Sequence, residues 1–517
     1  MSPSLSAAFC AASPRLSPRA MPLVSGLIYA AVFVLWLMLL SCAFFTSGIF
    51  AWSAGLFYIA YDTALLALIT RLTWPKVAAS LTSANASAAS GKSLLGKSLA
   101  GKSPDGETLD IRPSLGVIIA AYNEAAVLPE ILTALCGQTD RPDLILVVDD
   151  GSTDASVRIL SERFRIEPAS EGKLSSPSTI YPFLRMMRLP RSGKAEALNA
   201  ATVEVDTDII VAIDADTALD RHALEAMRQA FASDTSLVAA GGLLVPVCDR
   251  SLLGRVLQWF QTYEYIRSMV ARFALMSVNS LVLISGAFSA FRRDALVRVG
   301  GFDSRCMVED YELTHRMHRY SVEHGLGWRL QMITGAHAVT HAPGSFGSFM
   351  MQRRRWFAGY LQTQFWNRDL AGNARFGRLG TMMMTIKAFD TLQPIYGLTA
   401  GLLLIVFLLL GKAGIAIADQ FVDGLRLSAR NRGSGVIAIR RYHHRNITRA
   451  VFIPAIEASR RSVGLDILPD TASTLGHAEP DHARRRRQGR GPFQSVALSQ
   501  PQRLLLINRR IFFSEPA

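Results

Sequence analysis

The stretch Asp143–Asp154, DLILVVDDGSTD, says most about the fold. Five apolar residues run without a break and end in two aspartates, and the following Gly, Ser and Thr favour a turn and a helix start. A short, uninterrupted apolar run is typical of a strand that is covered on both faces of its sheet. The next segment, TDASVRILSERF, has the apolar spacing of a helix. This stretch therefore predicts a strand followed by a helix.

The same pattern recurs on either side of this stretch. Residues 115–124, LGVIIAAYNE, form an apolar run with a polar end, and AAVLPEILTAL after them has helical spacing. Residues 208–217, DIIVAIDADT, supply a further strand. Strands alternating with helices predict an α/β fold with a parallel sheet. In such open sheets the ligand crevice lies at the carboxyl ends of the strands, where all three polar clusters fall.

Two long apolar stretches precede this region. Leu23–Phe45 is almost unbroken and long enough to cross a bilayer, and Trp52–Ile69 is a second candidate, weakened by Asp62. A signal peptide explains only the first stretch, so the close pair favours a transmembrane hairpin. Basic residues flank the pair on both outer sides and the connection is uncharged, which predicts cytoplasmic flanks; these residues are Arg15, Arg19, Arg71 and Lys76.

The remaining organisation follows from composition. The linker repeat GKSLLGKSLAGKS matches a phosphate-loop pattern twice, but SANASAAS before it is no strand, so we interpret it as a flexible basic tether. Helices at 252–276 and 345–365 are basic and aromatic, as at a membrane interface, and Ile395–Leu410 is a third candidate span. The expected parts are a disordered N-terminus (1–21), a transmembrane hairpin (22–72), a linker (73–113), a cytosolic catalytic domain (114–344), interfacial helices with a span (345–424) and an Arg-rich disordered tail (425–517).

Composition sets the outer limits on function. The 517 residues are 50% hydrophobic with a mean hydropathy of +0.23, more than a soluble enzyme needs. The net charge of +14 fits the Lys and Arg bias of cytoplasmic membrane-protein surfaces. Nucleic-acid binding through the Arg-rich tail is disfavoured because no recognised reading module accompanies it. The five cysteines show neither CxxC nor metal-ligand spacing, so neither a disulfide framework nor a zinc site is indicated.

Acidic and amide side chains cluster after the three predicted strands. Asp214 and Asp216 can place oxygens on a divalent cation that also holds a diphosphate, because Mg²⁺ and Mn²⁺ commonly share ligands with substrate phosphates. Helix capping is the alternative explanation for any one of these clusters. It accounts less well for paired acids at two strand ends. The further candidates for binding a nucleotide donor are Asn123, Glu124, Asp149 and Asp150.

Three later motifs carry complementary chemistry. Lys194 opens a helix and suits a phosphate or a buried acid, although solvated surface charge is an equal alternative. Asp310 follows the Gly300–Asp303 turn and is the candidate base, since a carboxylate in a partly dry cleft can take the proton of an attacking hydroxyl. In a helical QRRRW motif, Gln352, Arg355 and Trp356 share one face. They are the candidates for binding diphosphate and acceptor, with Arg353 and Arg354 turned to lipid.

Taken together, these motifs resemble the processive family 2 glycosyltransferases, which include cellulose, hyaluronan and poly-N-acetylglucosamine synthases. The matching pieces cover residues 115–360: AAYNE, VVDDGSTD, GKAEALNAA, IDADT, SGAFSAFRRDAL, VGGFD, VEDYELTHRM and QRRRW. The resemblance implies a GT-A (Rossmann-like) fold, an inverting single displacement, and a UDP-sugar donor with Mg²⁺ or Mn²⁺. The short linker is closer to the poly-N-acetylglucosamine synthases than to cellulose synthase.

The resemblance also implies roles for individual residues. Asp149 or Asp150 would hold the uridine, Asp214 and Asp216 the donor and metal, and Asp310 would be the base. Gln352, Arg355 and Trp356 would bind diphosphate and acceptor, and Ser285–Phe288 would lie near the terminal sugar of the acceptor. The family's Thr-Glu-Asp reads Val308-Glu309-Asp310 here, which loses one hydroxyl and keeps both acids. Family members also continue with several spans after QxxRW, whereas this chain offers one.

The expected function is therefore transfer of a sugar from UDP-GlcNAc or UDP-glucose to a growing polysaccharide, by a multi-pass protein of the inner membrane with a cytoplasmic catalytic domain. Its partners would be the donor, a glycan acceptor, the bilayer and other membrane or export subunits, and no nucleic acid. One alternative is a non-processive transferase that acts on a lipid or short glycan. The other is an inactive membrane scaffold that binds a nucleotide-sugar.

Overall fold

A mixed sheet forms the centre of the computed structural model, which describes residues 3–45, 53–90 and 112–409. Among these residues the strand order is β3-β2-β1-β4-β7-β6-β8-β5. The first four strands pair in parallel, whereas β7 pairs antiparallel with both β4 and β6, and β5 pairs antiparallel with β8. The strands are β1 (Leu115–Ala121), β2 (Leu144–Asp150), β3 (Leu184–Leu189), β4 (Ile209–Asp214), β5 (Thr217–Leu219), β6 (Leu237–Val247), β7 (Phe288–Arg292) and β8 (Arg329–His341).

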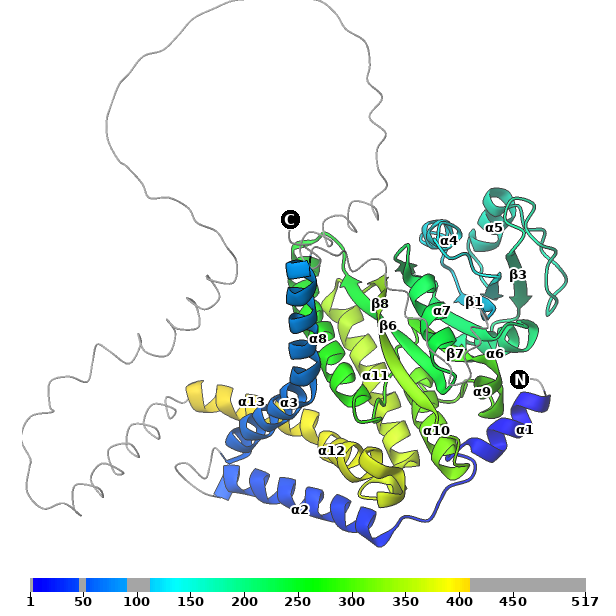
Figure 1. The fold of residues 1–517 in the computed structure, drawn as a ribbon. Coiled ribbons are helices and arrows are strands. Elements are labelled where there is room, and N and C mark those ends of the chain that lie inside the picture. Colours follow the sequence, from blue (N-terminus) through cyan, green and yellow to red (C-terminus); the bar gives the residue numbers. More distant parts are fainter. Residues whose placement is uncertain (1–2, 46–52, 91–111, 410–517) are drawn as a thin grey trace, which may run out of the picture. The chain divides into compact units, whose positions relative to one another are not determined.

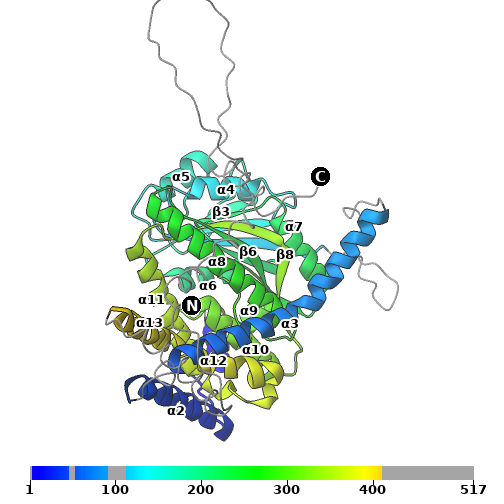
Figure 2. The same cartoon turned by 90° about the vertical axis from the view of Figure 1, so that its left-hand side faces the viewer.

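Helices cover the sheet and extend from it (Figures 1 and 2). The helices are α1 (Pro3–Ala12), α2 (Leu23–Phe45), α3 (Ser53–Ser90), α4 (Leu128–Cys136), α5 (Ser156–Phe164), α6 (Lys194–Glu204), α7 (Ala223–Ser233), α8 (Leu252–Met276), α9 (Arg293–Arg298), α10 (Glu309–Glu323), α11 (Phe346–Trp366), α12 (Thr385–Asp390) and α13 (Gln393–Leu409), with short turns η3 (Arg368–Leu370), η4 (Ala374–Phe376) and η5 (Leu379–Met384). The predicted alternation of strands and helices from residue 115 onward is confirmed.

The central strands bury both of their faces. In β1, Val117 and Ile119 pack into the hydrophobic cluster that includes α4 and α7, while Ile118 between them packs into the cluster with α6 and α10. Burying such a side chain contributes about 1.5–3 kcal/mol. The unbroken apolar runs therefore satisfy two layers at once, which explains why these strands lack the alternation of a half-exposed sheet.

The N-terminal segment differs from the disorder expected for residues 1–21. Residues 3–12 form α1, which contacts α9, and Leu5 and Phe9 are buried. The Arg15 guanidinium donates to both Asp303 oxygens, at 2.8 and 3.0 Å. Composition alone suggested disorder because the apolar residues of this segment are sparse. The helix and the Arg15 side chain are instead held against the folded domain by contacts distant in sequence.

Two described helices are long and apolar enough to cross a membrane, over Leu23–Cys42 in α2 and Gly55–Trp74 in α3. These two helices meet the criterion by their length and apolar composition alone. The helix α13 has 17 described residues, or about 26 Å, a little short of the ~30 Å hydrocarbon core. The phosphate-loop-like repeat and the Arg-rich tail lie outside the described residues.

The helix α3 runs alongside α8 (Figure 1). Asp62, the acid that interrupts the second apolar stretch, forms an ion pair with Arg267 of α8. The hydroxyl of the preceding residue, Tyr61, donates a hydrogen bond to Asp390 at 2.6 Å. The side chains of Tyr61 and Asp62 are therefore directed at other helices. Its helix also continues to Ser90, into the segment predicted as a linker.

Candidate active site

The acidic strand ends meet at one edge of the sheet. In the parallel ladders, Asp214 pairs with Ala120 of β1, and the next residue of β1, Ala121, pairs with Asp149 of β2. Asp216 follows two residues after Asp214, at the start of the turn into β5. The carboxyl ends of three adjacent strands thus present their acids together, as the predicted parallel sheet requires.

A cavity of about 470 Å³ opens beside these acids. Its wall draws on β4, α6, α8, α10 and α11. The predicted site residues that line it are Lys194, Asp214, Asp216, Asp310, Gln352, Arg355 and Trp356. The structure therefore brings together residues that are up to 162 positions apart in sequence, from Lys194 to Trp356, around one space.

The ammonium group of Lys194 lies between two carboxylates. Its Nζ is 2.6 Å from Asp214 Oδ1 and 3.0 Å from Glu309 Oε1. Burial alone would lower the pKa of Lys194, but the carboxylates of Asp214 and Glu309 outweigh it and raise that pKa above its ordinary value. Lys194 is thus a permanently charged cation that links Asp214, at the end of β4, to Glu309, at the start of α10.

Further acids nearby are destabilised in their charged form. Burial, followed by the charge of Asp214, raises the pKa of Asp216. Burial, followed by the charges of Asp216 and Asp214, likewise raises the pKa of Glu124. Crowded carboxylates of this kind are relieved by a cation. Within the described parts of the chain, no group of three or more His, Cys, Asp or Glu side chains is spaced to hold a metal ion. The carboxylates of Asp214 and Asp216 offer the oxygen ligands that Mg²⁺ and Mn²⁺ take, and the charge of Asp214 on Asp216 fits such a cation.

Asp310 stands in the first turn of α10 and faces the cavity. Its Oδ2 accepts a hydrogen bond from the Gly286 backbone N–H at 2.6 Å, and its Oδ1 accepts one from Tyr311 N–H at 2.8 Å. Burial first, and then the charge of Glu309, raise the pKa of Asp310 to about 6. A carboxylate with this pKa is ionised at neutral pH and basic enough to accept a proton in a reaction.

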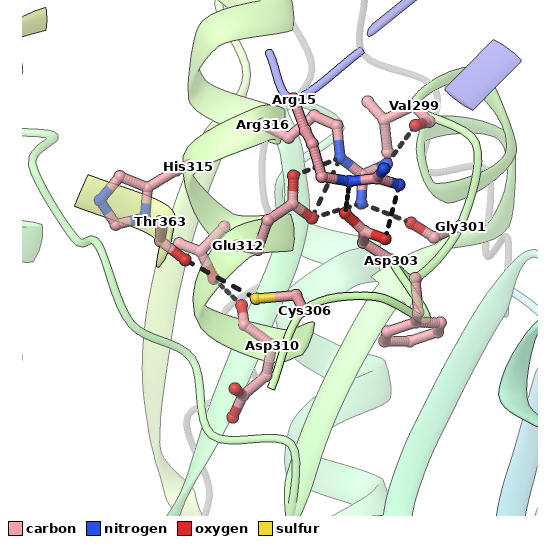
Figure 3. A network of polar contacts seen from close by, with 12 residues as sticks. Arg15, Val299, Gly301, Asp303, Cys306, Asp310, Glu312, His315, Arg316 and Thr363 are labelled. Atoms are coloured by element: carbon pink, nitrogen blue, oxygen red, sulfur yellow. Dashed lines mark hydrogen bonds and ion pairs between the residues drawn. The ribbon is translucent and has the colours of Figure 1, made fainter. Parts of the chain in front are cut away.

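The opposite face of α10 anchors the helix (Figure 3). Glu312 and Arg316 form a fully buried ion pair at 2.7 Å, and Arg316 also donates to the carbonyl oxygens of Val299 and, at 2.8 Å, Gly301. In Figure 3 the Asp310 carboxylate points away from this network. The sequence analysis did not single out this pair, although its i, i+4 spacing was visible. Its role is to fix the helix that presents Asp310.

Two predicted nucleotide-binding acids make internal contacts. Asp150 accepts hydrogen bonds from the N–H groups of Ser192 at 2.7 Å and Gly193 at 3.0 Å, and pairs with Arg191. These bonds shape the loop immediately before Lys194. Asp149 accepts from Ser152 N–H at 3.1 Å. Neither acid is among the residues that line the cavity.

Asn123 and Glu124 also lie outside the cavity wall. Asn123 adopts a left-handed conformation (φ 57°), and its Oδ1 accepts a hydrogen bond from Thr153 N–H at 2.8 Å. The Glu124 N–H donates to Ser156 Oγ at 3.1 Å. These bonds join the loop after β1 to the loop after β2, so both residues shape the edge of the site.

The helix α11 presents Gln352, Arg355 and Trp356 to the cavity, which agrees with the predicted shared face. The expectation that Arg353 faces lipid differs from the structure. Arg353 Nη1 donates to Glu264 Oε1 at 2.6 Å, and its guanidinium lies 4.4 Å from the centroid of the Trp356 ring. Glu264 itself lines the cavity from α8. Arg353 points inward because the carboxylate of Glu264 and the face of the Trp356 ring both attract its positive charge.

Sequence reasoning missed the contribution of α8. That helix was expected at the membrane interface, and its outer side does expose Trp259, Phe260 and Tyr263. Its inner side, with Tyr265 and Arg272 among others, forms a wall of the cavity. His341 at the end of β8 lines the same cavity. No local motif marks these residues, because their role depends on how α8 and β8 pack.

Comparison with known proteins identifies the family to which the chain is similar. The model for glycosyl transferase family 2 matches residues 116–300, and that for glycosyl transferase family group 2 matches residues 209–417. The poly-beta-1,6-N-acetyl-D-glucosamine synthase of Staphylococcus aureus strain COL is 25% identical over 244 residues, which cover 47% of this chain and 53% of that protein. The synthase of the same name from Staphylococcus epidermidis is 26% identical over 263 residues, 49% and 57% of the two chains. The matched region thus spans little more than half the length of these relatives.

Solved structures with a related chain course include mannosyltransferase PcManGT from Pyrobaculum calidifontis, in complex with GDP-Man and Mn²⁺. It is 21% identical, with a TM-score of 0.46 over 72% of this chain and 91% of that one. Staphylococcus aureus TarS is 14% identical, with a TM-score of 0.32 over 49% and 39%. From the two family models, which together run from residue 116 to 417, and from the curated relatives, this chain is a family 2 glycosyltransferase with a GT-A-like α/β fold that resembles the polysaccharide synthases.

Proposed function

We propose that this protein is a membrane-bound inverting glycosyltransferase that adds a sugar from a UDP-sugar, UDP-GlcNAc or UDP-glucose, to a growing polysaccharide. The observation that carries the proposal is the cavity whose wall holds Lys194, Asp214, Asp216 and Asp310 together. The similarity to poly-beta-1,6-N-acetyl-D-glucosamine synthases supports the choice of donor and product class.

In the proposed reaction Asp310 takes the proton of an acceptor hydroxyl. The hydroxyl oxygen forms a bond to the anomeric carbon of the donor sugar while the bond from that carbon to the diphosphate breaks. The nucleotide diphosphate leaves with the bonding electrons, and the anomeric configuration inverts. Gly286 and Tyr311 hold the Asp310 carboxylate in place through their N–H groups. Positioning of this kind, together with base catalysis, accounts for a large part of such rate enhancements.

The leaving diphosphate needs positive charge. Lys194 supplies a fixed cation beside Asp214, and Arg355 on α11 supplies another across the cavity. Asp214 and Asp216 would hold Mg²⁺ or Mn²⁺, which supplies Lewis-acid stabilisation of the developing negative charge when bound. Asp150 then acts through the backbone, because its hydrogen bonds to Ser192 and Gly193 set the position of Lys194.

A membrane location is part of the proposal. The apolar helices α2 and α3 would form the hairpin, at the inner membrane, with the catalytic domain in the cytoplasm. The pairing of Arg15 with Asp303 and of Arg19 with Glu323 supports this orientation, since both arginines precede α2 and contact the catalytic domain. The N-terminal flank would therefore share the side of the membrane on which the active site lies. The contact with other membrane or export subunits stays a prediction.

The proposal is tested with membranes containing the full chain, offered a panel of UDP-sugars with Mg²⁺. We expect incorporation of one sugar into a polymer, and its loss in Asp310→Asn while UDP-sugar binding remains. Asp206→Asn is the matched control, because Asp206 is 99% exposed and far from the cavity wall. Failure of every UDP-sugar to be incorporated, or full activity of Asp310→Asn, would refute the proposal. Product length on a gel separates a processive polymerase from a transferase that adds one sugar, and binding without any transfer would identify a scaffold.

A further inference from the structure

Arg272 on α8 carries an unusual combination of burial and missing partners. It lines the cavity. Its Nε and Nη1 atoms are buried, and neither has a hydrogen-bond partner within the described residues. Leaving buried N–H donors of a charged group unpaired costs free energy, more than for a neutral group. No hydrogen bond to these two atoms within the described residues offsets this free-energy cost.

The three arginines that are almost fully buried, Arg228, Arg316 and Arg319, are bonded where they lie. Arg316 pairs with Glu312 and donates to two backbone carbonyls. Arg228 donates to Asp140, Asp143 and two carbonyls. Arg319 pairs with Asp369 and donates to an amide oxygen. These arginines hold the fold together. Among the residues that the structure describes, Arg272 has no comparable set of bonds, so a purely structural role does not explain it.

Arg272 lies in the part of the cavity wall on which the charge of Asp310 acts. Burial lowers its pKa, and the charge that most opposes this effect is that of Asp310, followed by Tyr265. Arg272 and Asp310 line the same cavity, and Asp310 is the proposed base, so Arg272 borders the space that an attacking hydroxyl must enter.

We propose that Arg272 binds the acceptor, with its free N–H groups donating to oxygen atoms of the terminal sugar next to the hydroxyl that Asp310 deprotonates. This inference rests on the proposed function. Sugar hydroxyl and acyl oxygens supply the hydrogen-bond acceptors that the guanidinium lacks, and its planar array of donors can engage two of them at once. Arg272 thereby orients the attacking hydroxyl and contributes to the choice of acceptor.

The test uses the full chain in detergent or membranes, with Arg272→Gln and Arg272→Lys. Arg255→Gln is the matched control on the exposed side of the same helix. The probe is a short β-linked N-acetylglucosamine oligosaccharide. We expect Arg272→Gln to raise the KM for this acceptor about ten- to a hundredfold, the effect of losing a hydrogen bond to a charged group. Hydrolysis of the UDP-sugar in the absence of acceptor should stay within about twofold of the wild type. Arg272→Lys should recover part of the acceptor affinity, and Arg255→Gln should behave as wild type.

Two further readouts separate this role from the alternatives. Direct calorimetric binding of the oligosaccharide requires no transfer, so it tests Arg272 even if the proposed reaction fails. The melting temperature of Arg272→Gln should be unchanged or higher, since the substitution removes an unpaired buried charge, whereas a structural role would lower it. An unchanged affinity for the oligosaccharide in Arg272→Gln, or a parallel fall in donor hydrolysis, would overturn the proposal.

Discussion

The acid limb of the pH profile is the most direct probe of the proposed base. Asp310 must be ionised to accept a proton, and its pKa is raised to about 6. About half of the molecules are then active at pH 6 and about one in ten at pH 5, so the transfer rate should fall roughly fivefold between these two pH values and approach a tenfold fall per pH unit below pH 5. An aspartate with an ordinary pKa near 3.9 would leave the rate flat over this range.

Two substitutions should move this limb in opposite directions. Glu309 is the neighbouring charge that raises the pKa of Asp310, and Lys194 lowers it. Glu309→Gln removes a like charge, stabilises the ionised carboxylate and shifts the limb to lower pH. Lys194→Met removes a cation, destabilises the ionised carboxylate and shifts the limb to higher pH. Lys194→Met should also lower the maximal rate, because Lys194 belongs to the donor site.

The assay is initial-rate incorporation of sugar from a saturating UDP-sugar between pH 4.5 and 8, normalised to the plateau of each variant. Normalisation isolates the apparent pKa from the change in maximal rate. Asp206→Asn serves as the unperturbed reference. A wild-type rate that is level from pH 5 to 7, or shifts of both variants in the same direction, would refute the assignment of Asp310 as the base.

Further predictions concern the framework of the site. Asp150→Ala should raise the KM for the donor at least tenfold in a kinetic assay, because the loop before Lys194 loses the carboxylate that orders it; an unchanged KM would contradict this role. Arg15→Ala should destabilise the fold by about 2–3 kcal/mol in a thermal melt, since it leaves Asp303 buried and unpaired. Arg19→Ala, which breaks an exposed pair, should cost at most about 1 kcal/mol, and equal effects of the two would count against the docking of the N-terminal segment. Chelation by EDTA should abolish incorporation and added Mg²⁺ or Mn²⁺ should restore it, whereas full activity after chelation would remove the metal from the site.

The sequence by itself predicted the α/β fold and the cluster of acids at the ends of its strands. Apolar runs in Leu115–Ala121 and Leu144–Asp150 carry a local signal, because strand formation and two-sided burial depend on the residues of each run. Parallel pairing then places Asp214 near the other strand ends without further information. The shared face of Gln352, Arg355 and Trp356 likewise follows from helical spacing, which no distant contact has to supply.

Only the tertiary structure decided what depends on partners far along the chain. Arg15 contacts Asp303 at a separation of 288 residues, and Asp150 contacts Gly193 at a separation of 43. Composition predicted disorder for the segment that contains Arg15, and the sequence motifs gave no sign that Asp150 orders the loop before Lys194. The isolation of the Arg272 guanidinium within a cavity wall has no local signature either. Hydrogen bonding and burial depend on which groups lie close together in space. The local sequence around one residue does not specify which distant residues will become its neighbours.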